Sequence, residues 1–141
     1  MALDNIFGIA GSALNAQLTR MNATASNLAN AGTVAGSEKE AFRAKRPVFQ
    51  ALLNDEMTHA GAPYVGGVKI NKIMDDATPP VRVADPKNPM ADKDGFVYKS
   101  NVSEVTEMVE MMASARSYQN NVEVINTARQ LLMRTLEISK A

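Results

Sequence analysis

Carboxylates that could bind a metal ion stand close together in the second half of the chain. Asp92, Asp94 and Gly95 loosely match the start of a calcium-binding loop, and Glu104 stands twelve residues after Asp92, at the thirteenth position when Asp92 is the first. An EF-hand loop needs oxygen ligands at alternate positions, a glycine at the sixth and a bidentate glutamate at the twelfth. Here the glycine is at the fourth position, and the strand-like residues 96–98 fill the middle. We therefore interpret residues 92–95 as a turn that leads into a strand, and we predict no metal site.

The histidine and the remaining acidic residues lack the neighbouring residues that metal binding or catalysis would require. His59 is the only histidine and the chain has no cysteine, so neither a zinc site nor a nucleophile with a histidine base is indicated. Asp75 and Asp76 are adjacent, and Glu38 and Glu40 are nearly so, whereas acid–base catalysis needs carboxylates opposed in a cleft. No phosphate-binding loop or dinucleotide fingerprint occurs. We expect His59 and these acids to be solvated, and we expect no cofactor and no enzymatic activity.

The composition indicates a folded chain whose core is poor in aromatic side chains. Hydrophobic residues make up 45% of the 141 residues and aromatic residues 5%, with nine methionines and no tryptophan. Such a core packs adaptably and specifies its shape weakly, which suits apolar faces that contact other chains. The net charge of zero predicts neither nucleic-acid binding nor electrostatic binding to lipid. No apolar run is long enough for a transmembrane helix, and residues 1–8 do not resemble a secretory signal peptide.

Proline divides the chain into two ends that permit helix and a middle that does not. All six prolines lie within residues 47–89, and proline breaks the interior of a helix. Before them, apolar or small residues recur at 4-3 spacing from Phe7 to Leu28. This pattern predicts a helix from about Asp4 to Asn30, roughly 40 Å long. Gly32 is the expected left-handed stop after it.

The last segment shows the same heptad spacing over a greater length. The stripe runs from Met108 to Leu136 behind an N-cap signal at residues 101–104, and Arg129 is its one charged member. The helix would have about 36 residues and a length of roughly 55 Å, against a mean of about 12 residues in globular proteins. Since a shorter helix and a small β element cannot cover it, we expect part of its apolar stripe to need partners.

The middle of the chain predicts loops and short strands. Residues 32–40 are small and polar, and we interpret them as a flexible linker. Strand-like patterns occupy residues 42–53, 68–73, 81–83 and 96–98. The predicted fold is therefore mainly α, with long N- and C-terminal helices that form a coiled-coil-like pair and a small β-rich middle. The expected divisions are residues 1–31, 32–100 and 101–141.

Several stretches of the sequence resemble the rod and hook proteins of the bacterial flagellum. These stretches are SAL at 12–14, ASNLANA at 25–31, FRAK at 42–45, VF at 48–49, NPMADKDGFV at 88–97, NV at 101–102 and SYQNNVEVINTA at 117–128. They span nearly the whole chain in the order of the family, and the length suits a short proximal rod member. One departure is that a Thr-Pro-Gly-Tyr-like turn usually follows the first helix, whereas residues 31–37 are AGTVAGS and Phe42 comes later.

The resemblance implies a structural, non-enzymatic subunit of the flagellar basal-body rod in the periplasm. It implies export through the flagellar export apparatus without a cleaved signal, and helical polymerisation of the terminal helices into an inner tube around the export channel. The middle segment would lie outside that tube. The implied partners are other copies of the chain, homologous rod proteins, the export apparatus and the adaptor that joins rod to ring, but neither nucleic acid nor lipid.

The subunit interface is expected on the heptad stripes and on the amides that end the first helix. Its expected residues are Leu14, Leu18, Met21, Ala25, Asn27, Leu28, Asn30, Met108, Met111, Ala115, Tyr118, Val122, Ile125, Leu132 and Leu136. Asparagine has a poor intrinsic helix propensity, so residues 22–33 should be weakly helical alone and firm in an assembly. One hypothesis follows: Asn27→Leu stops rod formation while secretion continues, whereas a plain helix cap would make only Asn30 and Gly32 important.

Two other functions are compatible with the residues alone. A cytoplasmic helical adaptor or chaperone for an amphipathic partner would share the apolar stripes and the zero net charge. A small hydrolase would use the carboxylates of the middle segment, which are Asp75, Asp76, Asp92 and Asp94. The destination of the protein separates the adaptor from the rod subunit, and motility after replacement of the four acids tests the hydrolase.

Overall fold

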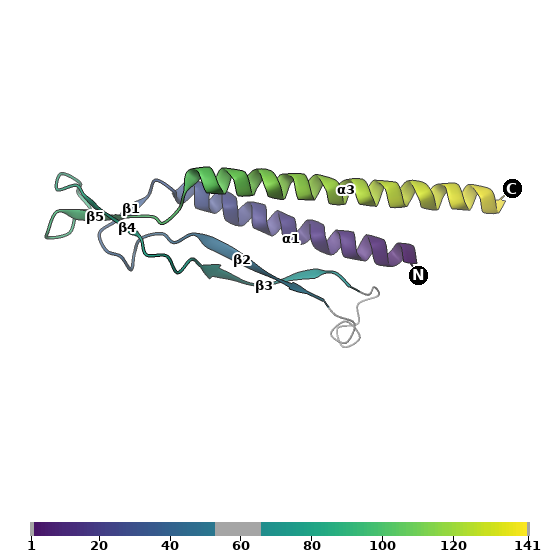
Figure 1. Cartoon of the computed structure of the whole chain (residues 1–141), viewed down its shortest axis with the longest axis horizontal. Coiled ribbons are helices and arrows are strands. Elements are labelled where there is room, and N and C mark those ends of the chain that lie inside the picture. The colour runs from purple at the N-terminus through teal and green to yellow at the C-terminus, as the bar shows by residue number, and fades with distance from the viewer. Residues whose placement is uncertain (1, 53–65, 141) are drawn as a thin grey trace. The chain divides into compact units, whose positions relative to one another are not determined.

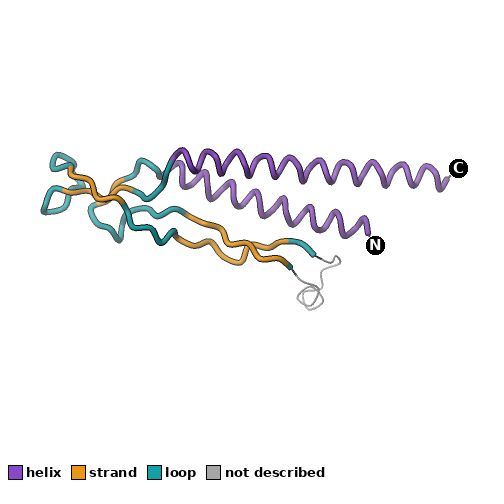
Figure 2. The backbone as a smooth tube through the Cα atoms, viewed as in Figure 1, coloured by secondary structure: helices purple, strands orange, loops and turns teal. Residues whose placement is uncertain are grey.

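The computed structural model describes residues 2–52 and 66–140, whose elements follow the predicted order (Figures 1 and 2). The elements are α1 (Ala2–Asn30), β1 (Val34–Ala35), β2 (Lys45–Ala51), β3 (Val68–Asp75), β4 (Val81–Ala84), β5 (Phe96–Lys99) and α3 (Glu104–Lys140). The prediction of a mainly α fold with a helix at each end and a small β middle is confirmed. His59 lies outside the described residues. No described helix combines the length and apolar content that crossing a membrane requires.

The strands form two small sheets. β5 is the central strand of the first, with β1 and β4 antiparallel on either side, so that Val34 pairs with Lys99 and Val83 with Val97. β2 and β3 form the second sheet. The interpretation of residues 32–40 as a flexible linker is therefore wrong in part, because β1 lies within them and Ala35 is buried. A two-residue strand has too little pattern to be recognised without its partner strand.

The backbone groups at the start of α3 and at the end of α1 find hydrogen-bond partners in different ways. Ser103 is the N-cap residue directly before α3, since its carbonyl accepts a hydrogen bond from Glu107 N at 3.0 Å and its Oγ accepts one from Thr106 N at 3.5 Å. The predicted left-handed Gly32 after α1 is wrong, because the described glycines with positive φ are Gly66, Gly67 and Gly95. Instead, Ser100 Oγ donates to Ala31 O at 2.7 Å and thereby satisfies a carbonyl at the helix end.

The chain divides into two compact units, and both helices contribute to each of them. Unit 1 contains the described residues of Met1–Thr19, Val48–Lys72 and Ala113–Ala141, and unit 2 contains Arg20–Pro47 and Ile73–Met112. In unit 1, Val68 N at the start of β3 donates to Ser12 Oγ of α1 at 3.1 Å. Unit 2 holds the three-stranded sheet and a cluster of buried polar side chains.

The buried line of α3 lies one position away from part of the predicted apolar stripe. Glu107, Ser114 and Ala128 are buried, each directly before a residue of the predicted stripe. Half-buried residues continue the 4-3 spacing between them, at Met111, Tyr118, Asn121, Ile125 and Leu132. A stripe defined by apolar residues alone misses this line, because two of its most buried members are polar.

The buried face of α1 is built of small residues. Ala10, Ala16, Ala23 and Asn27 are buried, whereas Leu18, a member of the predicted stripe, is 47% exposed. Alanine at these positions lets another backbone approach the helix closely, while Ile6, Ile9 and Leu18 of the same helix remain exposed.

Candidate functional site

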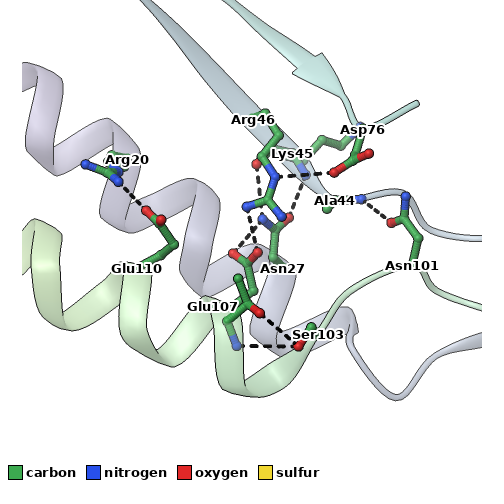
Figure 3. A network of polar contacts seen from close by, with 11 residues as sticks. Arg20, Asn27, Ala44, Lys45, Arg46, Asp76, Asn101, Ser103, Glu107 and Glu110 are labelled. Atoms are coloured by element: carbon green, nitrogen blue, oxygen red, sulfur yellow. Dashed lines mark hydrogen bonds and ion pairs between the residues drawn. The ribbon is translucent and has the colours of Figure 1, made fainter. Parts of the chain in front are cut away.

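A polar cluster in unit 2, which we call the junction, links the end of α1, the start of α3 and β2 (Figure 3). It consists of Asn27, Glu107, Arg46 and Asp76 together with the backbone of Lys45. Asn27 has no exposed area, and its Oδ1 accepts from Lys45 N at 2.7 Å while its Nδ2 donates to Lys45 O at 3.1 Å. The side-chain amide therefore pairs with the first residue of β2 as a neighbouring strand would.

Glu107 connects this amide to a charged partner. The carboxylate has no exposed area, and its Oε2 accepts from Asn27 Nδ2 at 2.9 Å. Its Oε1 lies 2.6 Å from Arg46 Nη1 without the geometry of a directed hydrogen bond, so the contact is an ion pair. A buried carboxylate is tolerated only when it is paired in this way. Figure 3 shows the Arg46 guanidinium between Glu107 and Asp76.

Asp76 forms the solvent-facing end of the junction. Its Oδ1 accepts from Thr78 N at 2.9 Å, and its Oδ2 lies 3.5 Å from Arg46 Nε. The hydrogen bonds from Thr78 hold the pKa of the Asp76 carboxyl below its usual value, and the Arg46 charge acts in the same direction.

Further contacts hold the backbone around the junction. Asn101 Oδ1 accepts from Ala44 N at 2.8 Å, and its Nδ2 donates to Thr78 O at 2.7 Å. Asp76 N donates to Ala44 O at 2.8 Å. Arg20 of α1 forms an ion pair with Glu110 of α3. The junction thus joins four segments that are far apart in the sequence.

The acids that could have held a metal ion are engaged in backbone contacts or ion pairs. Asp92 Oδ1 accepts from Asp94 N and from Phe96 N, both at 2.9 Å, which confirms the turn before β5. Asp75 pairs with Lys45. Within residues 2–52 and 66–140, no group of three or more potential metal ligands is found.

The structure divides the residues expected at the subunit interface into three classes. Leu18, Ala25, Met108 and Leu136 are exposed. Leu14, Met21, Leu28, Asn30, Met111, Ala115, Tyr118, Val122, Ile125 and Leu132 are half-buried. Asn27 is fully buried and is used within the chain.

The two amides at the end of α1 therefore have different roles. Asn30 Nδ2 donates to Ser26 O of its own helix at 2.8 Å, whereas Asn27 bonds only to distant segments. The expectation of a direct contact between the Asn27 side chain and a neighbouring subunit does not fit its burial.

Sequence reasoning missed Glu107 and Arg46 of the junction, and Ser100 and Ser114. All four are polar, and the search for a core used apolar periodicity. One signal was present: Glu107 and Ser114 are seven residues apart, and Met111 completes a 4-3 spacing between them. A polar residue at such a core position requires a buried partner, which the sequence alone does not identify.

Two models of known protein families match the two terminal parts of the chain. Residues 7–35 match the family model of the flagella basal body rod protein, and residues 93–138 match that of the flagellar basal body rod FlgEFG protein C-terminal region. These two regions contain most of α1 and most of α3.

Curated relatives match over the whole length. The flagellar basal-body rod protein FlgC of Escherichia coli O6:H1 is 46% identical over 140 residues, which cover 99% of this chain and 100% of that protein. FlgC of Salmonella typhimurium is 45% identical with the same coverage. FlgC of Bacillus subtilis is 36% identical over 94% of this chain and 95% of that protein. The chain therefore belongs to the FlgC family of flagellar basal-body rod proteins.

Proposed function

We propose that this chain, a structural and non-enzymatic subunit of the periplasmic flagellar rod, joins the rod through apolar faces of its two terminal helices. The observation that carries the proposal is the similarity to FlgC proteins over 99% of the chain, both helices included. A cytoplasmic adaptor is not supported by these relatives, and a hydrolase disagrees with their structural role.

Exposed apolar side chains on both helices support this mode of assembly. Leu18 of α1, and Met108 and Leu136 of α3, are 47%, 55% and 49% exposed, and Ile6 and Ile9 are also exposed. Large apolar side chains left in water on two helices indicate contacts with other chains. A heterologous contact of this kind does not close on itself and propagates as a helical filament.

We further propose that residues 1–31 and 101–141 form the inner part of the rod and that residues 32–100 form its outer part. A coiled-coil-like pairing of the two helices is supported by the 4-3 spacing of the buried line on α3. The proposed subunit interface comprises the exposed and half-buried members of the predicted stripes. Asn27 is excluded from this interface, because its side chain is fully buried and hydrogen-bonded within the junction.

The chain assembles with other rod components. The individual partners named below are proposals. We propose contacts with copies of itself, with homologous rod proteins and with the adaptor that joins rod to ring. We also propose passage through the flagellar export apparatus without a cleaved signal. These partners follow from the family resemblance and not from a feature of the chain's own surface.

Deletion of the gene in its own bacterium, followed by electron microscopy of basal bodies, tests the function. We expect the membrane ring to persist and the hook and filament to be absent. Re-expression of the chain should restore both structures, whereas Leu18→Glu, which places a charge on the proposed interface, should be exported without restoring them. Asn22→Glu, at an exposed amide of the same helix, is the matched control. Hooks and filaments in the deletion strain would refute the function.

A further inference from the structure

A second face of α3, opposite in character to its buried line, is exposed along almost the whole helix. Residues eleven positions apart lie on one line of a straight α-helix, because eleven residues complete about three turns. We call this line the outer stripe. Its members are Val105, Val109, Met112, Arg116, Asn120, Glu123, Thr127, Leu131 and Arg134, all of them exposed. Figure 1 shows α3 as one continuous helix.

The outer stripe is apolar near its N-terminal end and at Leu131, and it is charged near its centre and at Arg134. Val105, Val109 and Met112 are 74%, 61% and 67% exposed, and Leu131 is 54% exposed. Arg116 and Glu123 stand between them, and neither forms an ion pair with a described residue. The face therefore offers apolar area together with Arg116 and Glu123, a cation and an anion that have no charged partner among the described residues, and with a second cation, Arg134, near its C-terminal end.

We propose that two free copies of this chain pair antiparallel through the outer stripe, with the two-fold axis midway between Gln119 and Asn120. In this register Arg116 lies opposite Glu123 of the second copy, and Glu123 lies opposite Arg116 of the second copy. Two ion pairs of opposite charge are thus made by one symmetric contact. A parallel pair in register would instead place arginine against arginine and glutamate against glutamate, which is unfavourable.

The same register brings apolar residues at the start of α3 level with Leu131 and Thr127 of the second copy. Met108, which flanks the outer stripe, is level with Leu131 of the second copy, and Met112 is level with Thr127 of the second copy. Leu131 and Thr127 line a hollow in unit 1, to which Ile6 and Val124 also contribute. Methionine is unbranched and flexible, so it fills an irregular apolar hollow well. Charge and shape therefore favour the same alignment of the two helices.

Such a pair is isologous, and an isologous contact closes after two copies. The rod contact proposed above is heterologous and must continue. The dimer is accordingly a form of the unassembled chain that hides Met108 and Met112 from water, and it must separate before the chain enters the rod. This inference does not depend on the rod function, since self-association of the free chain is measured in its absence.

Sedimentation of the purified full chain, from about 1 to 100 µM, tests the pairing by its charges. We expect a monomer–dimer equilibrium that Arg116→Glu or Glu123→Arg alone weakens by at least about tenfold, because each places like charges opposite one another. The double variant Arg116→Glu with Glu123→Arg should restore dimerisation to within about threefold. Arg129→Glu, on another face of α3, is the matched control. A monomer at all concentrations, or a double variant no better than the single ones, would overturn the proposal.

Cysteine cross-linking tests the antiparallel register, and the absence of natural cysteine makes it specific. Asn120→Cys, next to the two-fold axis, should form a disulfide-linked dimer on mild oxidation. Val105→Cys should not, because the two copies of residue 105 would be about 44 Å apart along the helices. A mixture of Val105→Cys and Arg134→Cys should cross-link. Cross-linking of Val105→Cys with itself would show a parallel pair, and failure of both Asn120→Cys and the mixture would show no pair; either result overturns the proposal.

Discussion

The junction in unit 2 and the outer stripe of α3 use polar and apolar side chains in opposite ways. The junction buries an amide and a carboxylate completely, whereas the outer stripe exposes valine, methionine and leucine. Directed polar contacts accept only one arrangement of their partners, so the junction specifies how α1, α3 and β2 meet within the chain. Exposed apolar area accepts many partners, so the outer stripe is suited to contacts with other chains. Buried polar contacts thus fix the packing within the chain, whereas exposed apolar side chains serve contacts with other chains.

The largest effect is expected from removing the buried carboxylate of the junction. Glu107→Ala leaves Asn27 Nδ2 without its acceptor and Arg46 without its buried counterion, and loss of one partner of such a pair costs about 3 kcal/mol. Urea unfolding followed by circular dichroism measures this loss. Glu104→Ala, at an exposed acid in the first turn of the same helix, is the control. Equal losses for the two variants would mean that the junction does not specify the fold.

Replacement of the buried amide should have the next largest effect. Asn27→Leu keeps a similar volume but leaves Lys45 N and Lys45 O without their partner, at a cost of about 2 kcal/mol in unfolding free energy. Asn22→Leu, at an exposed amide of α1, should change stability by less than about 0.5 kcal/mol.

The same two variants, Asn27→Leu and Asn22→Leu, can be compared in cells by their secretion and rod formation. If Asn27 acts through the shape of the junction, Asn27→Leu should be secreted and should fail to form rods, with a parallel loss of stability. Full stability together with failed rod formation would indicate a direct contact with a neighbour and would contradict its complete burial.

A smaller effect is expected at the turn before β5. Gly95 has a φ of +79°, and a Cβ atom there would lie 3.1 Å from Pro86 Cβ. Gly95→Ala should therefore cost about 1 kcal/mol, because an L side chain is strained at this φ. Gly11→Ala, in a helical position with no atom within 4 Å of the added Cβ, should instead be neutral or stabilising. Similar unfolding midpoints for the two variants would contradict the strain.

The smallest effect concerns pH. Because the folded pKa of Asp76 is lowered, its contribution to stability is present above the unfolded pKa and is lost as pH falls through the folded value. Asp76→Asn should lower the free energy of unfolding in urea slightly at pH 6, by less than about 0.5 kcal/mol, as for solvent-accessible ion pairs. The difference from the unmodified chain should shrink as pH falls below the usual aspartate value of 3.8. A difference that stays constant with pH would exclude this ionisation as its cause.

The elements could be predicted because their signals are local. The 4-3 spacing and the absence of proline gave both helices, and the end of α1 at Asn30 agrees with the structure. The strand patterns and the aspartate–glycine turn located β2, β3, β4 and β5 within a few residues. By contrast, β1 and the end contact from Ser100 could not be predicted, because each depends on a segment more than sixty residues away.

The sequence by itself determined the order and approximate length of the helices and of every described strand except β1 and, through its family resemblance, the class of protein. Only the tertiary structure decided which face of each helix is buried. One residue turns a helix by about 100°, so a stripe of mixed apolar residues does not distinguish the buried line of α3 from its neighbour. Partners distant in the sequence make that choice: Glu107 is buried because Asn27 and Arg46 meet it, eighty residues separating Asn27 from Glu107.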